Sequence, residues 1–150
     1  MKVTNGSFQA RLEHLEEVSN LFDQYRIFYK ASSDLGAVRN FLQERFQNSD
    51  SIIFVASNDG HIIEFTQLYP SFSSVSMQRI WILNDLFVEQ SNRQQGVATL
   101  LLSAAADFAR ESNAIRITLA TQISNISAQS LYESLGYGKD EEFYHYLFRV

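Results

Sequence analysis

The most chemically suggestive segment runs from an apolar stretch ending at Val88 into a predicted helix that starts at Gly96. A helix start leaves several backbone N–H groups without partners inside the helix, and its dipole is positive there. Together these features favour an anion such as a pyrophosphate. Gly96 and Ala98 have no large side chain to keep a phosphate from the backbone, while Arg93 and Thr99 add a charge and a hydroxyl. Alone, this Arg-x-x-Gly-x-Ala pattern also fits an ordinary strand-to-helix turn.

Several other chemistries are excluded by what the sequence lacks. Neither the Gly-x-Gly-x-x-Gly dinucleotide fingerprint nor a Gly-x-x-x-x-Gly-Lys-Ser/Thr phosphate loop occurs. The chain has no cysteine, so disulfides, thiolate metal ligands and cysteine nucleophiles are excluded. Its three histidines show no metal-ligand spacing, and we expect no metal. A net charge of -5 argues against a nucleic-acid partner.

The elements that position the anion-binding turn follow from apolar spacing and from the few breaks in the chain. Strands are expected near residues 3–12, 52–56, 62–68, 79–88, 115–120 and 143–150, and helices near 14–29, 35–46, 96–110 and 127–135. Asn58, Asp59 and Gly60 predict a tight hairpin between the second and third strands, and a loop is expected at Pro70. The order β-α-α-β-β-β-α-β-α-β predicts a mixed α/β fold, with one domain over residues 1–150.

No apolar run is long enough to span a bilayer, and the first residues lack the apolar stretch of a secretory signal. We therefore expect a cytoplasmic protein without a membrane partner.

A second pattern lies downstream of the turn. Asn125 precedes a predicted helix in which Tyr132 is followed, four residues later, by Gly136 and then Tyr137. With the Arg-x-x-Gly-x-Ala turn, this pattern resembles the two linked motifs of the GNAT superfamily of N-acetyltransferases. The order of the predicted elements is similar over essentially the whole chain. Within the superfamily, the sequence looks most like the small diamine or histone-type acetyltransferases.

The resemblance implies a GNAT fold, with a central, mostly antiparallel twisted sheet flanked by helices, and acetyl-CoA as the cosubstrate. The pantetheine arm would lie along the strand that ends at Val88, and the pyrophosphate would meet backbone N–H groups of residues 94–99. The implied cofactor-binding residues are Leu86, Phe87, Val88, Arg93, Gln94, Gln95, Gly96, Val97, Ala98, Thr99, Asn125 and Ala128.

The resemblance also implies that an amine attacks the thioester directly, without a covalent enzyme intermediate. Tyr132 stands where the family has a tyrosine acid for the leaving thiolate, although a tyrosine packed on the core also fits. For proton removal we expect an ordered water held by Asn84. Strand alternation would place Asn84 beside Leu86 on the reacting face and Asp85 on the other, in a structural role.

The acceptor side is expected partly on the first two helices, where Tyr25, Tyr29 and Asp34 are candidates. Both tyrosines also fit the apolar stripe of their helix, and Asp34 fits a helix cap. Glu64 replaces a glycine that is usual in the related subgroups. It is either a base outside the motifs or an exposed carboxylate at the sheet edge.

Three functions are compatible with these patterns. The first is an enzyme that acetylates a primary amine on a small molecule, a peptide or a protein, with a homodimer as one expected assembly. The second is a CoA-binding sensor or regulatory module without significant turnover. The third is an interaction domain that has lost CoA. The intact glycine turn and Tyr132 favour the enzyme over the sensor, because a sensor has no need to keep the acid. An interaction domain without CoA would be expected to have a bulky residue at Gly96 or Ala98, and neither position has one.

Overall fold

The computed structural model describes residues 6–93 and 96–150, in two compact units, Met1–Leu119 and Ala120–Val150. The elements of the first unit are β1 (Gly6–Gln9), the 3-10 turn η1 (Leu12–His14), α1 (Leu15–Phe28), α2 (Leu35–Asn48), β2 (Ile52–Asn58), β3 (His61–Ser73), β4 (Gln78–Val88), the 3-10 turn η2 (Gln90–Asn92), α3 (Val97–Glu111) and β5 (Ile117–Leu119). The second unit contains α4 (Ile126–Ser134). None of the described helices is both long and apolar enough to cross a membrane.

The predicted mixed α/β class is confirmed, and the predicted element order is confirmed as far as α4. The final strand at residues 143–150 is wrong, because these residues form no regular element. Their apolar side chains are largely exposed, including Phe148 at 86%. A strand exists only through hydrogen bonds to a neighbour. The described residues of the second unit contain no strand with which residues 143–150 could pair. The alternation of apolar residues was therefore not enough to form a strand there.

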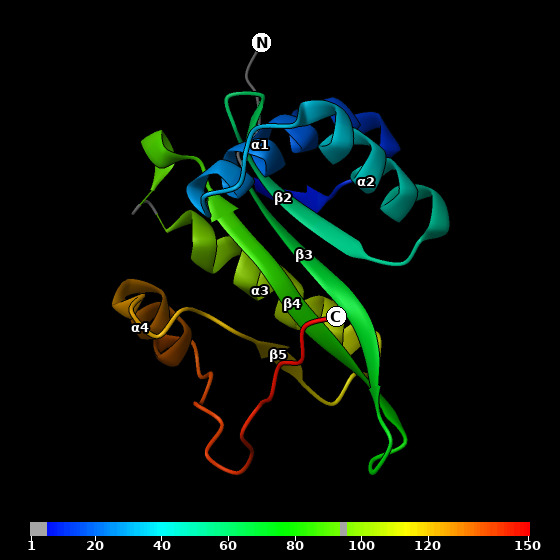
Figure 1. Cartoon of the computed structure of the whole chain (residues 1–150), viewed down its shortest axis with the longest axis vertical. Helices are drawn as coiled ribbons and strands as arrows, with labels where there is room; N and C mark the ends of the chain where they lie inside the picture. Colours follow the sequence, from blue (N-terminus) through cyan, green and yellow to red (C-terminus); the bar gives the residue numbers. More distant parts are fainter. Residues whose placement is uncertain (1–5, 94–95) are drawn as a thin grey trace. The chain divides into compact units, whose positions relative to one another are not determined.

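The five strands form one sheet in the order β1-β2-β3-β4-β5 (Figure 1). The first three pairings are antiparallel, and β4 pairs with β5 in parallel. The predicted hairpin between β2 and β3 is confirmed. Asp59 and Gly60 have φ angles of 52° and 82°, as two-residue hairpin turns of this kind require.

The predicted loop at Pro70 is wrong, because β3 continues through Pro70 to Ser73. Pairing between β2 and β3 extends from the hairpin to Leu68, where it joins Ile52. Beyond Leu68, β3 has only β4 as a neighbour, and Pro70 pairs with Trp81 there. A proline is tolerated on such an edge, because one side of the strand needs no N–H donor.

Helices cover both faces of the sheet (Figure 1). On one face lie α1 and α2, where Phe22 of α1 stacks on Phe65 of β3 with ring centroids 5.4 Å apart. On the other face lies α3, where Phe108 meets Phe54 of β2 at 5.6 Å. The buried apolar cluster between the sheet, α1 and α2 consists of Ala10, Val18, Leu21, Phe22, Val38, Leu42, Ile53, Val55, Ile62, Phe65 and Phe87.

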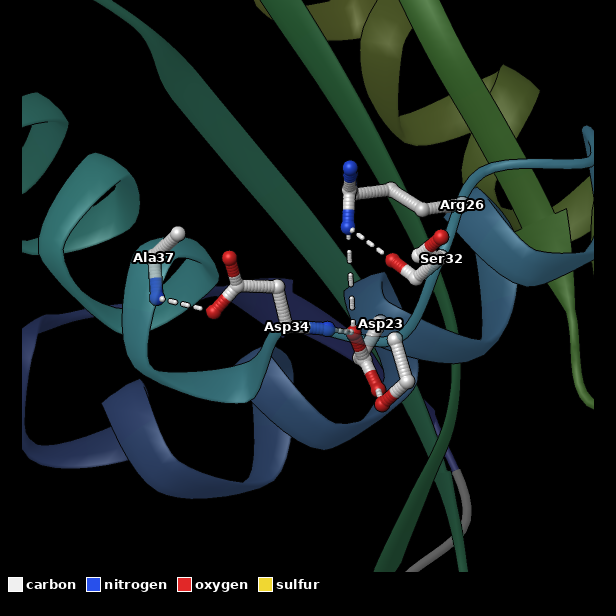
Figure 2. Close-up of polar contacts among 6 residues, drawn as sticks. Asp23, Arg26, Ser32, Asp34 and Ala37 are labelled. Atoms are coloured by element: carbon white, nitrogen blue, oxygen red, sulfur yellow. Dashed lines mark hydrogen bonds and ion pairs between the residues drawn. The ribbon is translucent and has the colours of Figure 1, made fainter.

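A buried aspartate on α1 fixes the connection between α1 and α2 (Figure 2). Asp23 accepts hydrogen bonds from the Ser33 hydroxyl at 2.7 Å and from the Asp34 backbone N–H at 2.9 Å. The hydroxyl of Ser33, then the N–H of Asp34, and more weakly the charge of Arg26, lower the pKa of Asp23 against the effect of burial. Asp34 itself caps α2, with Oδ1 accepting from the N–H of Ala37. The cap role expected for Asp34 is confirmed.

Candidate active site

Strand β4 contains a β-bulge at its middle. Asp85 pairs with Gln67 and Leu83 pairs with Leu68, so Asn84 is an extra residue without a partner on β3. The expected alternation is therefore wrong across this point. Trp81, two residues before Leu83, lies against Phe108 on the α3 face, whereas Asp85 is bonded to a side chain of α1.

The bulge also marks the point where β4 and β5 separate. Their pairing runs from Trp81 with Ile117 to Leu83 with Leu119, where β5 ends. From Asn84 to Val88, none of the described strands pairs with this edge of β4. The opposite edge stays bonded to β3, with Leu86, Phe87 and Val88 opposite Thr66, Phe65 and Glu64. Apart from the Val88 oxygen, which accepts from Arg93, this open stretch offers backbone N–H and C=O groups to an extended ligand.

Helix α3 begins directly after the open edge and η2. Gly96 is its N-cap residue, with φ of 75° and no side-chain cap. Val97, Ala98 and Thr99 form the first turn, whose N–H groups have no partners within the helix. A Cβ on Gly96 would meet no atom of the described residues within 4 Å. The protein itself therefore requires this glycine only for its left-handed backbone. Gln94 and Gln95 lie outside the described residues.

Arg93 is held against the end of β4. Its Nε donates to the backbone oxygen of Val88 at 2.9 Å. Its guanidinium lies over the rings of Phe28 and Phe87, at 5.0 and 5.3 Å from their centroids. No ion pair joins it to a carboxylate among the described residues. The side chain thus carries a positive charge that packs on two aromatic rings at the end of β4.

A network of polar side chains surrounds Asp85, which is 6% exposed. Its Oδ1 accepts from the Tyr25 hydroxyl at 2.8 Å and from Asn84 Nδ2 at 3.2 Å. Its Oδ2 accepts from Gln67 Nε2 at 3.0 Å, and its backbone oxygen accepts from the Thr66 hydroxyl at 2.7 Å. The structure therefore brings together the candidates Tyr25 and Asn84 through Asp85.

Tyr29 lies next to this network rather than in it. Its ring meets that of Tyr25 at 5.2 Å, and 45% of the residue is exposed. With Phe28, which is 52% exposed, it forms a partly open aromatic surface at the end of α1.

Glu64 is neither exposed nor at an edge, so that expectation is wrong. β3 lies between β2 and β4, and Glu64 is 0% exposed. It pairs with Ala56, two residues from Phe54, and therefore faces α3. Neither of its carboxylate oxygens has a hydrogen-bond partner among the described residues. Burial raises the pKa of Glu64 to about 8.

In the second unit, Asn125 is the N-cap of α4, and its Oδ1 accepts from the backbone N–H of Ala128 at 3.1 Å. Tyr132 lies on the same helix, with its ring 5.8 Å from that of Tyr137. This geometry explains why an asparagine precedes the helix, independently of any ligand.

A polar pocket of about 500 Å³ opens at another part of the first unit, beside the β2–β3 hairpin. It is lined by Glu17, Asn20, Leu21, Gln24, Asn58, Asp59, His61, Ile62, Ile63, Glu89 and Asn92. None of the residues predicted to carry the chemistry is among them. Among the described residues, no group of three or more His, Cys, Asp or Glu side chains is arranged to hold a metal.

Gln67 was not among the residues predicted for the site, although it donates a hydrogen bond to Asp85. A glutamine between apolar residues of a buried strand was the available signal, because a buried amide needs partners. The position of the bulge had no comparable local signal.

An open strand edge that leads into a glycine-started helix suits an extended ligand that carries phosphate groups. The profile of the acetyltransferase (GNAT) family matches residues 15–137. The chain therefore belongs to this family and is an acetyltransferase.

Individual relatives agree with the family match. An uncharacterized N-acetyltransferase of Bacillus subtilis (strain 168), YhfO, is 48% identical over 142 residues, 95% of each chain. A probable acetyltransferase of Haemophilus influenzae is 31% identical over 129 residues, 85% of this chain and 84% of the relative. The crystal structure of another probable acetyltransferase, 42% identical, matches with a TM-score of 0.92 over 96% of this chain and 97% of that one.

Proposed function

We propose that this acetyltransferase transfers the acetyl group of acetyl-CoA to a primary amine by direct attack on the thioester. The observation that carries the proposal is the open edge of β4 from Asn84 to Val88, followed by the start of α3 at Gly96. The pantetheine arm would add to this edge as an extended strand does. The pyrophosphate would meet the N–H groups of the first turn of α3, beside the guanidinium of Arg93.

The proposed chemistry gives a role to several of the residues that the sequence analysis singled out. Asn84 lies at the point where β4 and β5 separate, next to the thioester in this proposal. Tyr132 is proposed to protonate the leaving thiolate, while Asn125 and Ala128 would contact the pantetheine arm. The acceptor would approach beside Tyr25 and Tyr29 at the end of α1. An amine-bearing small molecule, peptide or protein fits this scheme.

The test is CoA thiol release from acetyl-CoA, measured over a panel of primary amines. We expect amine-dependent release, and a decrease in kcat of roughly 100-fold in the Tyr132→Phe variant, the usual contribution of a general acid. Tyr144→Phe, at a residue that is 91% exposed, is the matched control. Tight binding of acetyl-CoA without release on any amine would instead support a sensor module.

The Gly96→Glu variant tests the proposed binding site for the phosphates of acetyl-CoA. The new side chain adds a negative charge at the proposed phosphate site and strains a backbone with φ of 75°. We expect loss of the thermal stabilisation that CoA gives the wild-type protein. Gly96→Ala carries the strain without the charge and should keep part of the stabilisation. Full stabilisation of Gly96→Glu by CoA would place the phosphates elsewhere.

A further inference from the structure

Asp85 is a buried carboxylate whose hydrogen-bond donors among the described residues are all neutral. Tyr25, Asn84 and Gln67 supply these donors, and no ion pair joins Asp85 to any described Lys, Arg or His. Removing a carboxylate from water without a countercharge is costly, even when it is hydrogen-bonded. A buried carboxylate with hydrogen-bond donors but no described countercharge, next to the open edge of β4, is therefore a candidate proton acceptor.

Tyr25 is held rigidly between this carboxylate and the face of the sheet covered by α1. Its ring packs against those of Phe22, Phe65 and Phe87, with centroids 5.8, 5.4 and 5.7 Å away. Its hydroxyl proton is donated to Asp85 at 2.8 Å. Any further partner of the phenol oxygen is therefore a hydrogen-bond donor, and an ammonium group is such a donor.

Asp85 is in turn fixed from its other side. Gln67 is 0% exposed and donates to Oδ2, while its own oxygen accepts from the Ser51 hydroxyl at 2.9 Å. The bulge at Asn84 turns Asp85 toward α1, at the residue where β4 loses β5 as a neighbour. Tyr25 and Asp85 thus lie beside the edge where the acetyl donor is proposed to bind, and Tyr25 is only partly buried.

We propose that Tyr25 and Asp85 form a proton relay for the acceptor amine, an inference that rests on the proposed acetyl transfer. The acceptor ammonium donates one proton to the Tyr25 oxygen, as the Tyr25 hydroxyl proton moves to Asp85. The neutral amine then attacks the thioester carbon, and the C–S bond breaks. The second proton of the nitrogen ends on the thiolate, and Asp85 later releases its proton to water. Tyr25 is the catalytic residue of this step, and Asp85 is a positioning residue that acts through it.

The test compares acceptor amines of different basicity at one pH. Amines that are protonated at that pH need the relay to lose a proton, whereas amines that are already neutral do not. Tyr25→Phe removes the hydroxyl and keeps the packed ring. For alkylamines, which are almost entirely protonated at neutral pH, we expect kcat/KM to fall roughly 100-fold. For weakly basic primary amines, which are already mostly neutral, we expect a decrease of less than about fivefold. Asp85→Asn should give the same pattern.

Tyr69→Phe is the matched control, since it removes the hydroxyl of another partly buried tyrosine, one that does not donate to Asp85. Thermal unfolding and CoA binding of each variant verify that fold and donor site are intact. If Asp85→Asn does not fold, Tyr25→Phe decides the question alone. Equal losses with all amines, or none, would overturn the relay and leave acetyl transfer in place. Absence of transfer by the wild-type protein on every amine would overturn both.

Discussion

Two carboxylates are buried on opposite faces of the same sheet, and their surroundings differ completely. Asp85 faces α1 and receives three side-chain hydrogen bonds. Glu64 faces α3, is fully buried and receives none among the described residues. Burial alone favours the neutral form of an acid, whereas donors favour its charge. The comparison makes Glu64 a neutral acid at moderate pH and leaves Asp85 as the carboxylate that its surroundings supply with hydrogen-bond donors.

The largest expected effect comes from the charge on Glu64. Its pKa is about 8 in the folded protein against an ordinary 4.5, so the unfolded chain releases the proton first as the pH rises. The free energy of unfolding should therefore fall between about pH 5 and pH 8. At about 1.4 kcal/mol for each unit between the two pKa values, the decrease is at most about 5 kcal/mol.

Glu64→Gln, which cannot ionise, should lose this pH dependence. Urea unfolding from pH 5 to pH 9 measures it, with the exposed Glu44→Gln as the control that keeps the wild-type profile. If the free energy of unfolding changed with pH in the same way for wild type and Glu64→Gln, Glu64 would not be a neutral buried acid and would not differ from Asp85 as stated.

The next largest effect on stability is expected when Asp85 loses a hydrogen-bond donor. Gln67→Leu removes the donor to Asp85 Oδ2 and the acceptor of the Ser51 hydroxyl. Bonds to charged groups contribute about 1.5 to 3 kcal/mol, so we expect a loss of about 3 kcal/mol in the free energy of unfolding. Ser51→Ala removes only a neutral bond and should cost about 1 kcal/mol. Equal costs for the two variants, read from urea unfolding at pH 7, would show that Asp85 does not depend on its donors.

A smaller effect is expected at Asp23, a third buried carboxylate that is well supplied with donors. Asp23→Ala should cost about 2 kcal/mol at pH 7, because it leaves Ser33 and the N–H of Asp34 without their acceptor. The pKa of Asp23 is lowered, so this contribution is present at neutral pH and is lost as the pH falls below about 4. Asp107→Ala, in an exposed pair with Arg110, should change stability by less than about 0.5 kcal/mol. A cost of Asp23→Ala that stays constant as the pH falls below about 4 would contradict the role of its charge.

Local signals in the sequence were sufficient for most of the fold. The hairpin at Asn58–Gly60, the cap at Asp34 and the helix start at Gly96 depend on backbone conformations that few residues favour. The strand at residues 143–150 and the loop at Pro70 were wrong. Whether each segment forms a strand depends on which other strand lies next to it, and the sequence of one segment does not show which strand that is.

The site was predicted less completely for the same reason. The bulge at Asn84 is visible only when β3 and β4 are aligned, and it reverses which residues share a face. Glu64 was misjudged because an acidic residue is normally exposed, and its neutral buried form is a property of the packed sheet. The roles of Asn84, Tyr132 and the CoA-contacting residues stay predictions.

The most direct test of the account follows the acetyl group through one turnover. The protein is mixed with an equimolar amount of acetyl-CoA that carries an isotope-labelled acetyl group, together with an excess of the best primary amine. Mass spectrometry then follows both the amine and the intact protein. Direct attack predicts that the label passes into an N-acetylated amine while the mass of the protein stays unchanged throughout. A transient protein mass increased by one acetyl group, or label that stays in acetyl-CoA, would contradict the account.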